Sequence, residues 1–155
     1  MNDVTIESYQ QLVSYLEEGC KPIEEWRIGT EHEKFGFIKK NKKPLKYFGE
    51  NGVLSIFQGL VNLGWKPVYE QSNIIALSSG KQSITLEPGG QLELSGAPLY
   101  NIHETCREVN SHLSQLKSVS EKMGIGFIGL GFHPKLRVDE APLMPKSRYK
   151  IMKDY

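Results

Sequence analysis

Two short segments each carry two glutamates, and in the first they stand two residues apart, the spacing that puts side chains on one face of a β-strand. In residues 29–33, Glu31 and Glu33 share a face, and apolar neighbours indicate a partly buried strand. Two carboxylates this close repel each other, and burying either one unpaired costs free energy. A divalent cation removes both penalties, and oxygen ligands suit Mg²⁺. A solvated strand face is the alternative, and the pattern alone leaves both interpretations open.

The second segment, residues 87–96, contains Glu87, a Pro-Gly-Gly break, and then Gln91 and Glu93 on one face of an expected strand. The break can re-aim the chain and leave room for a ligand near the backbone. A hairpin turn with polar neighbours also explains this segment when it is taken alone. Two such strands together offer enough carboxylates for more than one magnesium ion. The candidate metal ligands are therefore Glu31, Glu33, Glu87 and Glu93.

A third segment, residues 144–152, places Arg148 and Tyr149 at the start of an expected helix. The planar guanidinium of arginine matches a carboxylate in two-pronged hydrogen bonding, so this pair could hold a substrate carboxylate. The alternative is an exposed, basic helix start.

The elements that position these residues follow from hydrophobic periodicity. Strands are expected at residues 26–38, 66–69, 74–77, 83–86, 91–94 and 125–132, and helices at 8–18, 52–63, 100–123 and from 146 onward. Because they do not alternate as βαβ units, the sequence predicts an α+β fold with a mainly antiparallel sheet and flanking helices.

Two of these elements carry predictions about burial. The long helix is expected to bury an apolar stripe of Ile102, Cys106, Val109, Leu113, Leu116 and Met123. Strand 125–132 is nearly all apolar, which is typical of a strand covered on both faces.

Bulk composition excludes several classes of protein. A formal net charge of +1 speaks against a nucleic-acid-binding surface, and no apolar run approaches the ~20 residues that span a membrane. Residues 1–19 hold four acidic residues and no lysine or arginine, unlike a targeting peptide, so a cytoplasmic protein is expected. Cys20 and Cys106 are expected to be unpaired and mostly buried.

Three motifs, in this order, carry a family resemblance: residues 26–37 (WRIGTEHEKFGF), 85–98 (TLEPGGQLELSGAP) and 144–149 (MPKSRY). Together they resemble the glutamate–cysteine ligases of plants and proteobacteria, and the similarity extends across nearly the whole chain. The resemblance implies a glutamine-synthetase-like catalytic fold with a curved antiparallel sheet. It implies ATP-dependent ligation of the glutamate γ-carboxylate to the cysteine amine through an acyl phosphate, the first step of glutathione synthesis.

The resemblance also assigns roles to residues. It makes Glu31, Glu33, Glu87 and Glu93 ligands of Mg²⁺, places Gln91 beside them as a substrate-binding residue, and gives Arg148 and Tyr149 to the glutamate substrate, with Arg148 the candidate catalytic residue. The expected small-molecule partners are glutamate, cysteine and ATP. There are two alternatives to this function. One is a related ligase that uses another amine, and the other is an inactive fragment that only binds.

Members of that family are several hundred residues long. Residues 1–155 are therefore expected to be the N-terminal part of one catalytic domain that continues further, and to be inactive alone. The nucleotide site is expected beyond residue 155, and the helix from residue 146 is expected to be interrupted by the chain end.

Overall fold

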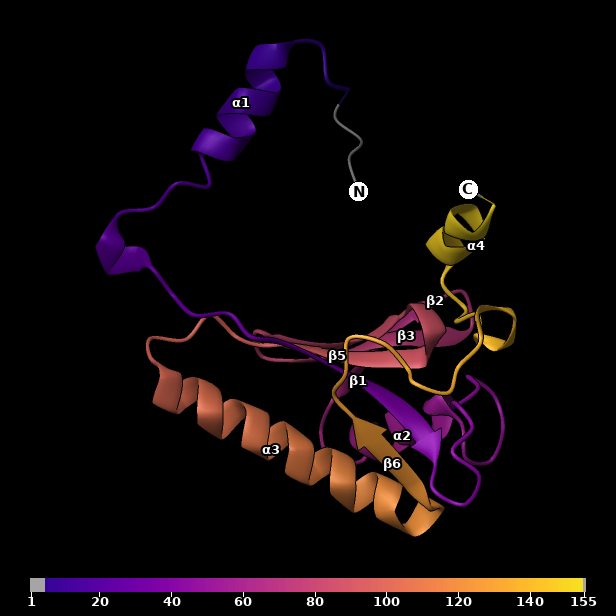
Figure 1. The fold of residues 1–155 in the computed structure, drawn as a ribbon. Helices are drawn as coiled ribbons and strands as arrows, with labels where there is room; N and C mark the ends of the chain where they lie inside the picture. Colours follow the sequence, from indigo (N-terminus) through magenta and orange to yellow (C-terminus); the bar gives the residue numbers. More distant parts are fainter. Residues whose placement is uncertain (1–4, 155) are drawn as a thin grey trace.

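The computed structural model describes residues 5–154, which form one antiparallel sheet with α-helices on either side (Figure 1). Its strands within this range are β1 (Glu31–Ile38), β2 (Lys66–Glu70), β3 (Asn73–Ser79), β4 (Gln82–Glu87), β5 (Gln91–Ser95) and β6 (Ile125–Ile128), in the spatial order β2-β3-β4-β5-β1-β6. Every strand pair is antiparallel, so the predicted α+β class is confirmed.

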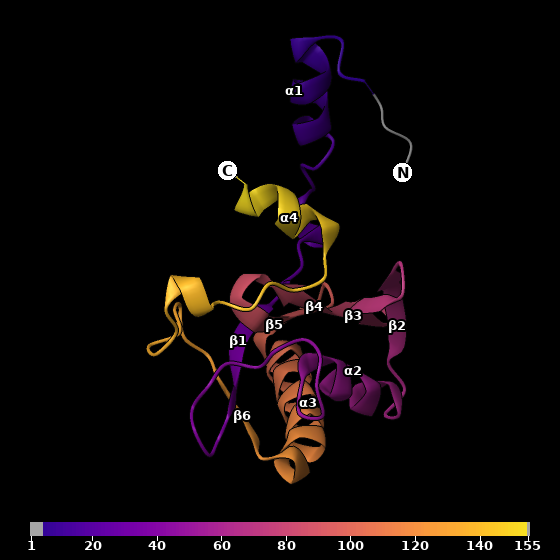
Figure 2. The same cartoon turned by 90° about the vertical axis from the view of Figure 1, so that its right-hand side faces the viewer.

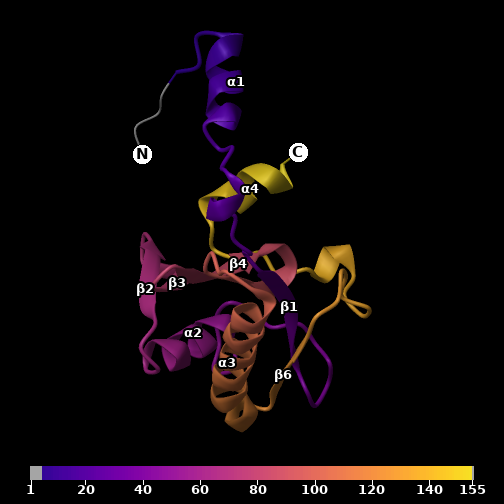
Figure 3. The same ribbon diagram turned by 90° about the vertical axis from the view of Figure 1, so that its left-hand side faces the viewer.

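Helices α2 (Val53–Val61) and α3 (Ile102–Ser120) cover one face of the sheet, while α1 (Tyr9–Glu17) and α4 (Ser147–Lys153) lie on the other side (Figures 1 and 2). The side chains that β4 and β5 turn toward α2 and α3 are fully buried leucines and isoleucine: Ile84, Leu86, Leu92 and Leu94. These side chains and the apolar face of α2 form the core. Figure 3 shows α2 and α3 together on the side of the sheet away from α1 and α4.

The two faces of the sheet differ because side chains alternate along each strand. On β5, buried Leu92 and Leu94 alternate with partly exposed Gln91, Glu93 and Ser95. One face is therefore apolar and packed, and the opposite face carries the polar side chains that the sequence singled out.

Several predicted boundaries move. β1 begins at Glu31, not at residue 26, because Ile28 makes only an isolated bridge to Leu99. The C-terminal helix runs from Ser147 to Lys153, with Asp154 at the C-cap position. The short strands β2 to β5 lie where the sequence places them.

The burial predicted for the long helix is wrong for part of its apolar stripe. α3 turns Thr105, Glu108 and His112 toward the sheet, whereas Ile102 is 63% exposed and Leu113 is 39% exposed. Leu116 is buried as predicted. The face that packs is therefore set by polar contacts as well as by the apolar stripe.

Two other burial predictions are also wrong. β6 is an edge strand that pairs only with β1 among the described residues, and just Ile125 is buried in it. Phe132, the end of the predicted strand, is 72% exposed in a loop. Cys20 and Cys106 are unpaired, as expected, but both thiols are exposed because Cys20 lies beyond α1 and Cys106 lies on the outer side of α3.

Helix α1 stands apart from the sheet in all three ribbon views. A capping box between Ser8 and Gln11 starts it, but none of its residues is buried. Its amphipathic pattern therefore predicted the helix correctly, while its apolar side faces no other described element. Across residues 5–154, no helix has the length and apolar character that crossing a bilayer requires.

The packed face also contains a buried charge. Lys34 of β1 is 2% exposed, and its ammonium donates to the His32 carbonyl at 2.8 Å and lies 3.1 Å from His112 Nε2 on α3. Burial lowers the pKa of Lys34 to about 8, although the Glu93 carboxylate opposes this shift. Burial, aided by the Lys34 charge, lowers the pKa of His112 to about 3. The His112 imidazole is therefore neutral in the folded protein at neutral pH.

We expect His112 to make the fold sensitive to acid. Its folded pKa of about 3 lies below the ordinary value of 6.5, so the unfolded chain binds the proton first. The stabilisation is complete above about pH 6.5 and is lost as the pH falls toward 3, by up to about 1.4 kcal/mol per pH unit. Urea unfolding from about pH 7 to 4 should show a shallower decline for His112→Gln, whose side chain cannot take up a proton. Identical declines in both proteins would contradict this assignment.

Candidate functional site

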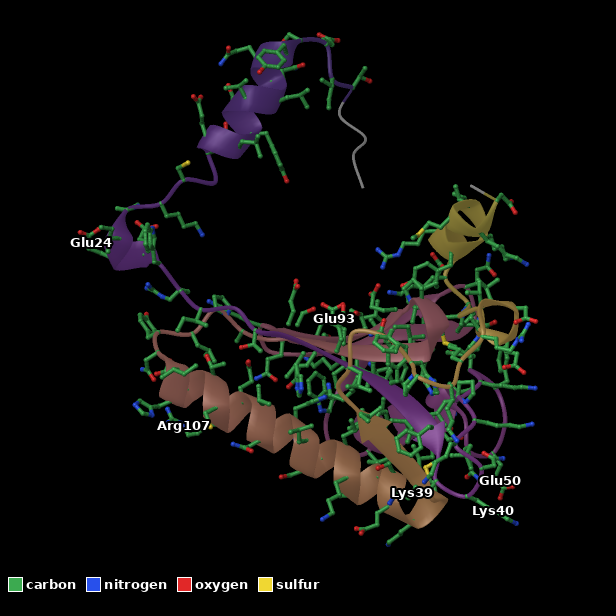
Figure 4. The ribbon with its side chains drawn as sticks, in the orientation of Figure 1. Glu24, Lys39, Lys40, Glu50, Glu93 and Arg107 are labelled. Carbon is green, nitrogen blue, oxygen red and sulfur yellow. The ribbon has the colours of Figure 1, made fainter. Side chains whose placement is uncertain are left out.

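The glutamates of β1 and β5 meet across one strand pair. The antiparallel register places Glu33 directly opposite Glu93 and Glu31 opposite Ser95. Figure 4 shows Glu93 on the side of the sheet away from α3, facing the side where α1 and α4 lie. The next strand continues the arrangement, since Thr85 of β4 pairs with Glu93 and Glu87 pairs with Gln91. All the predicted glutamates therefore share one face of the sheet.

Neutral side chains hold the carboxylates of Glu33 and Glu93. Ser95 Oγ donates to Glu93 Oε1 at 2.9 Å, and Thr85 Oγ1 lies 3.2 Å from Glu93 Oε2. Gln91 Nε2 donates to Glu33 Oε2 at 3.3 Å. Hydroxyl and amide donors orient a carboxylate without cancelling its charge. The described part of the chain pairs neither glutamate with a lysine or arginine, so this part of the face stays negative.

Glu87 lies in a different electrostatic environment at the end of β4. Its Oε1 is 3.3 Å from Arg148 Nη2 and 3.6 Å from Lys146 Nζ. The Tyr149 hydroxyl lies 3.1 Å from its other oxygen, Oε2. Two cations therefore neutralise Glu87, unlike Glu33 and Glu93.

Contacts between α4 and β4 determine the environments of Lys146, Arg148 and Tyr149. Tyr149 is buried, and its hydroxyl donates to the Leu86 carbonyl at 2.6 Å; this burial raises the pKa of Tyr149. Lys146 Nζ donates to the same carbonyl at 2.5 Å, and burial lowers the pKa of Lys146. The hydrogen bond from Arg148 to Tyr149 raises the pKa of Arg148. Arg148 is thus the exposed member of this group, with a side chain that is 60% accessible.

The start of α4 is fixed by a contact with the edge strand β2. The backbone N–H and hydroxyl of Ser147 donate to the Glu70 carboxylate of β2 at 2.7 and 2.8 Å. These hydrogen bonds lower the pKa of Glu70. Contacts to both β2 and β4 therefore define where α4, and with it Arg148, stands.

The predicted site residues thus form two groups on one face. Glu31, Glu33, Gln91 and Glu93 gather on β1 and β5, and Glu87 gathers with Arg148 and Tyr149. Within residues 5–154, no three acidic, histidine or cysteine side chains are close enough together to enclose a metal ion. A cation on this face would be bound by two or three carboxylates whose side chains move toward it. Water molecules would fill its remaining coordination positions.

Sequence reasoning missed Lys146, Glu70 and Thr85. Thr85 had a local signal, because it lies two residues before Glu87 on the same strand. Lys146 and Glu70 gave none, since their partners Glu87 and Ser147 are distant in sequence and only the fold brings them together.

Comparison with known proteins agrees with the motifs. The family model described as glutamate–cysteine ligase family 2 matches residues 27–155. Chloroplastic glutamate–cysteine ligase A of rice (Oryza sativa subsp. japonica) is 56% identical over 147 residues, which is 94% of this chain and 29% of the rice protein. The chloroplastic enzymes of Medicago truncatula and Arabidopsis thaliana are 55% and 53% identical over the same share of the chain, and 28% of each enzyme is covered.

These relatives correct one expectation. These relatives are named as chloroplastic enzymes, which contradicts the cytoplasmic location predicted from the acidic residues 1–19. The composition of that segment indicates only that it is not itself a basic targeting peptide.

The chain spans less than a third of the length of these relatives. The family-model match includes every predicted site residue and, apart from Trp26, all three motifs. A family-model match over residues 27–155, together with identities of 53–56% to three plant enzymes, is enough to assign the chain to a family. This chain belongs to glutamate–cysteine ligase family 2.

Proposed function

We propose that the family-length protein containing this chain joins the γ-carboxylate of glutamate to the cysteine amine at the expense of ATP. The observation that carries the proposal is the pairing of Glu33 with Glu93 on the open face of the sheet, where only neutral groups hold them. In the proposed reaction, ATP phosphorylates the γ-carboxylate, and the amine nitrogen then attacks the acyl carbon and releases phosphate.

The residues proposed to hold Mg²⁺ are Glu31, Glu33 and Glu93. Their oxygen atoms suit a hard divalent cation, and within the described residues none of the three carboxylates forms a direct ion pair with a lysine or arginine. Such an ion, when bound, neutralises charge on the phosphoryl group as it is transferred. Glu87 was a fourth candidate from the sequence, but Lys146 and Arg148 already balance its charge. We therefore assign Glu87 to the positioning of Arg148.

Arg148 is proposed to bind a carboxylate of the glutamate substrate. Among the described residues its hydrogen bonds all use Nη2, so Nε and Nη1 have no partner there and are available to a ligand. A guanidinium edge with two parallel N–H groups suits a carboxylate. Tyr149 is too buried for a large contact, so we propose that it positions Arg148, and that Gln91 orients Glu33 for its ligand.

Two alternatives depend on what lies outside this chain. Another amine could replace cysteine, because the residues proposed here bind metal and glutamate and do not select the amine. A binding protein without turnover is the second alternative. We propose that residues 1–155 form one part of a catalytic domain that includes further family sequence, and that they have no ligase activity alone.

We expect Glu93→Gln in the family-length protein to lower turnover by about 100-fold, because an amide binds Mg²⁺ weakly and leaves phosphoryl charge uncompensated. The same change should leave the fold as stable or raise its stability by up to about 1 kcal/mol, since it removes the repulsion from Glu33. Steady-state phosphate release at saturating ATP and Mg²⁺, together with urea unfolding, measures both effects.

Glu121→Gln is the matched control, because Glu121 is an exposed glutamate at the far end of α3. It should change neither turnover nor stability. Wild-type turnover for Glu93→Gln would remove Glu93 from the metal site. A large loss of stability in that variant would instead indicate a structural carboxylate.

The amine is tested with the same family-length protein. Phosphate release from ATP should require glutamate, and the γ-glutamyl product should form with the highest kcat/KM when cysteine is the amine. Serine and alanine, which keep the amino acid backbone but lack the thiol, are the comparison substrates. A higher kcat/KM for another amine would support the related-ligase alternative. An absence of glutamate-dependent ATP turnover with every amine would support the binding protein.

A further inference from the structure

Helix α3 meets the packed face of the sheet with polar side chains. Glu108 is 8% exposed and His112 is 2% exposed, and they lie one helical turn apart on the same side of the helix. Buried polar groups cost free energy unless they are hydrogen-bonded, so each of their atoms needs a partner.

His112 contacts the strand that carries Glu31 and Glu33. The Lys34 ammonium has only donor hydrogens, so the His112 Nε2 atom 3.1 Å away must accept. A neutral imidazole that accepts at Nε2 carries its proton on Nδ1. His112 Nδ1 is thus a buried donor, and it has no partner among the described residues.

Glu108 contacts the chain that leaves β5. Its Oε1 accepts a hydrogen bond from the Ala97 backbone N–H at 2.8 Å. Its Oε2 packs so closely on Gly96 that a Cβ atom there would lie 2.2 Å from it. Oε2 is also buried without a partner within the described part of the chain. It is an acceptor, one turn away from the His112 donor.

Both residues line one cavity of about 240 Å³ between α3 and the strands. Its other polar side chains are Ser79, Gln82, Ser111, Gln115 and Trp65, whose indole N–H donates to Gln115 Oε1 at 2.8 Å. Polar cavities of this kind hold ordered water when two to four groups can bond each molecule, and one water takes roughly 30 Å³. His112 and Glu108 stand on adjacent turns of α3 among the residues that line this cavity, and each has one buried atom without a partner within residues 5–154, a donor and an acceptor respectively.

We propose that water in this cavity bridges His112 Nδ1 and Glu108 Oε2, and that the resulting chain from Lys34 to Ala97 positions the carboxylates of β1 and β5. This inference rests on the proposed function, because it assigns a purpose to the spacing of Glu33 and Glu93. Lys34, His112 and Glu108 are positioning residues, since they act from the opposite face and touch no substrate.

The physical need for such a chain comes from the face above it. Glu33 and Glu93 repel each other across the ladder, and the leucines beneath them pack without directional preference. Hydrogen bonds are directional, and α3 bonds β1 through Lys34 and the exit of β5 through Ala97. Hydrogen bonds to the same helix therefore fix the positions of both strands.

The first test is direct. A crystal structure of the family-length protein at high resolution should show a water within hydrogen-bonding distance of both His112 Nδ1 and Glu108 Oε2. A direct contact between these two side chains, or an apolar group in the cavity, would overturn the proposal. This result does not depend on any activity, so it stands apart from the proposed ligase reaction.

The second test separates positioning from folding. His112→Gln keeps an acceptor for Lys34 and a donor toward the cavity, whereas His112→Leu keeps neither; His103→Leu removes an exposed histidine from the same helix. We expect His112→Leu to raise the Mg²⁺ concentration for half-maximal turnover by about tenfold, with a smaller change in kcat, as for other residues behind metal ligands. His112→Gln should recover most of this loss.

The outcomes of the second test are distinct. If His112→Leu shifts the Mg²⁺ dependence no more than His103→Leu does, the positioning role is wrong even when Glu93→Gln abolishes turnover. If Glu93→Gln retains turnover, the proposed metal site fails first. Should His112→Leu not fold, the comparison of His112→Gln with wild type and the crystallographic water still decide the matter.

Discussion

The pairing of Glu33 with Glu93 across β1 and β5 sets the constraint on which the rest of this structure depends. Like charges placed directly opposite each other in a sheet are destabilising, by up to about 1 kcal/mol. The strands nevertheless stay paired because their other faces bury Leu92 and Leu94 completely. The packed face therefore supplies the stability that lets the open face keep an unfavourable charge arrangement, as sites built for ligands often do.

The open face has two electrostatic environments side by side. Near β1 and β5 the carboxylates have hydroxyl and amide partners only, and near the end of β4 the carboxylate of Glu87 has Lys146 and Arg148. The first environment attracts a cation and the second offers a guanidinium to an anion. Thr85, which lies 3.2 Å from both Glu87 and Glu93, marks the boundary between them.

Local pattern was sufficient for β2 to β5 and for the shared face of the glutamates, because period-two alternation is a short-range property. It failed for α3, whose stripe through Ile102 and Leu113 is exposed while Glu108 and His112 are buried. Their hydrogen-bond partners, Ala97 N–H and Lys34, become neighbours only through the fold. Burial of β6 failed for a related reason, since an apolar run does not specify how many neighbours a strand has.

The close approach of Gly96 to Glu108 has a consequence for how this family can vary. A Cβ atom at position 96 would lie 2.2 Å from Glu108 Oε2 and 3.1 Å from the Thr30 carbonyl oxygen, so alanine there requires the Glu108 side chain to shift. Aspartate at position 108, shorter by one methylene, would make room for alanine at 96 but would withdraw from Ala97 N–H. Substitutions at positions 96 and 108 are therefore expected to occur together in homologous sequences. One position follows β5 and the other lies in α3.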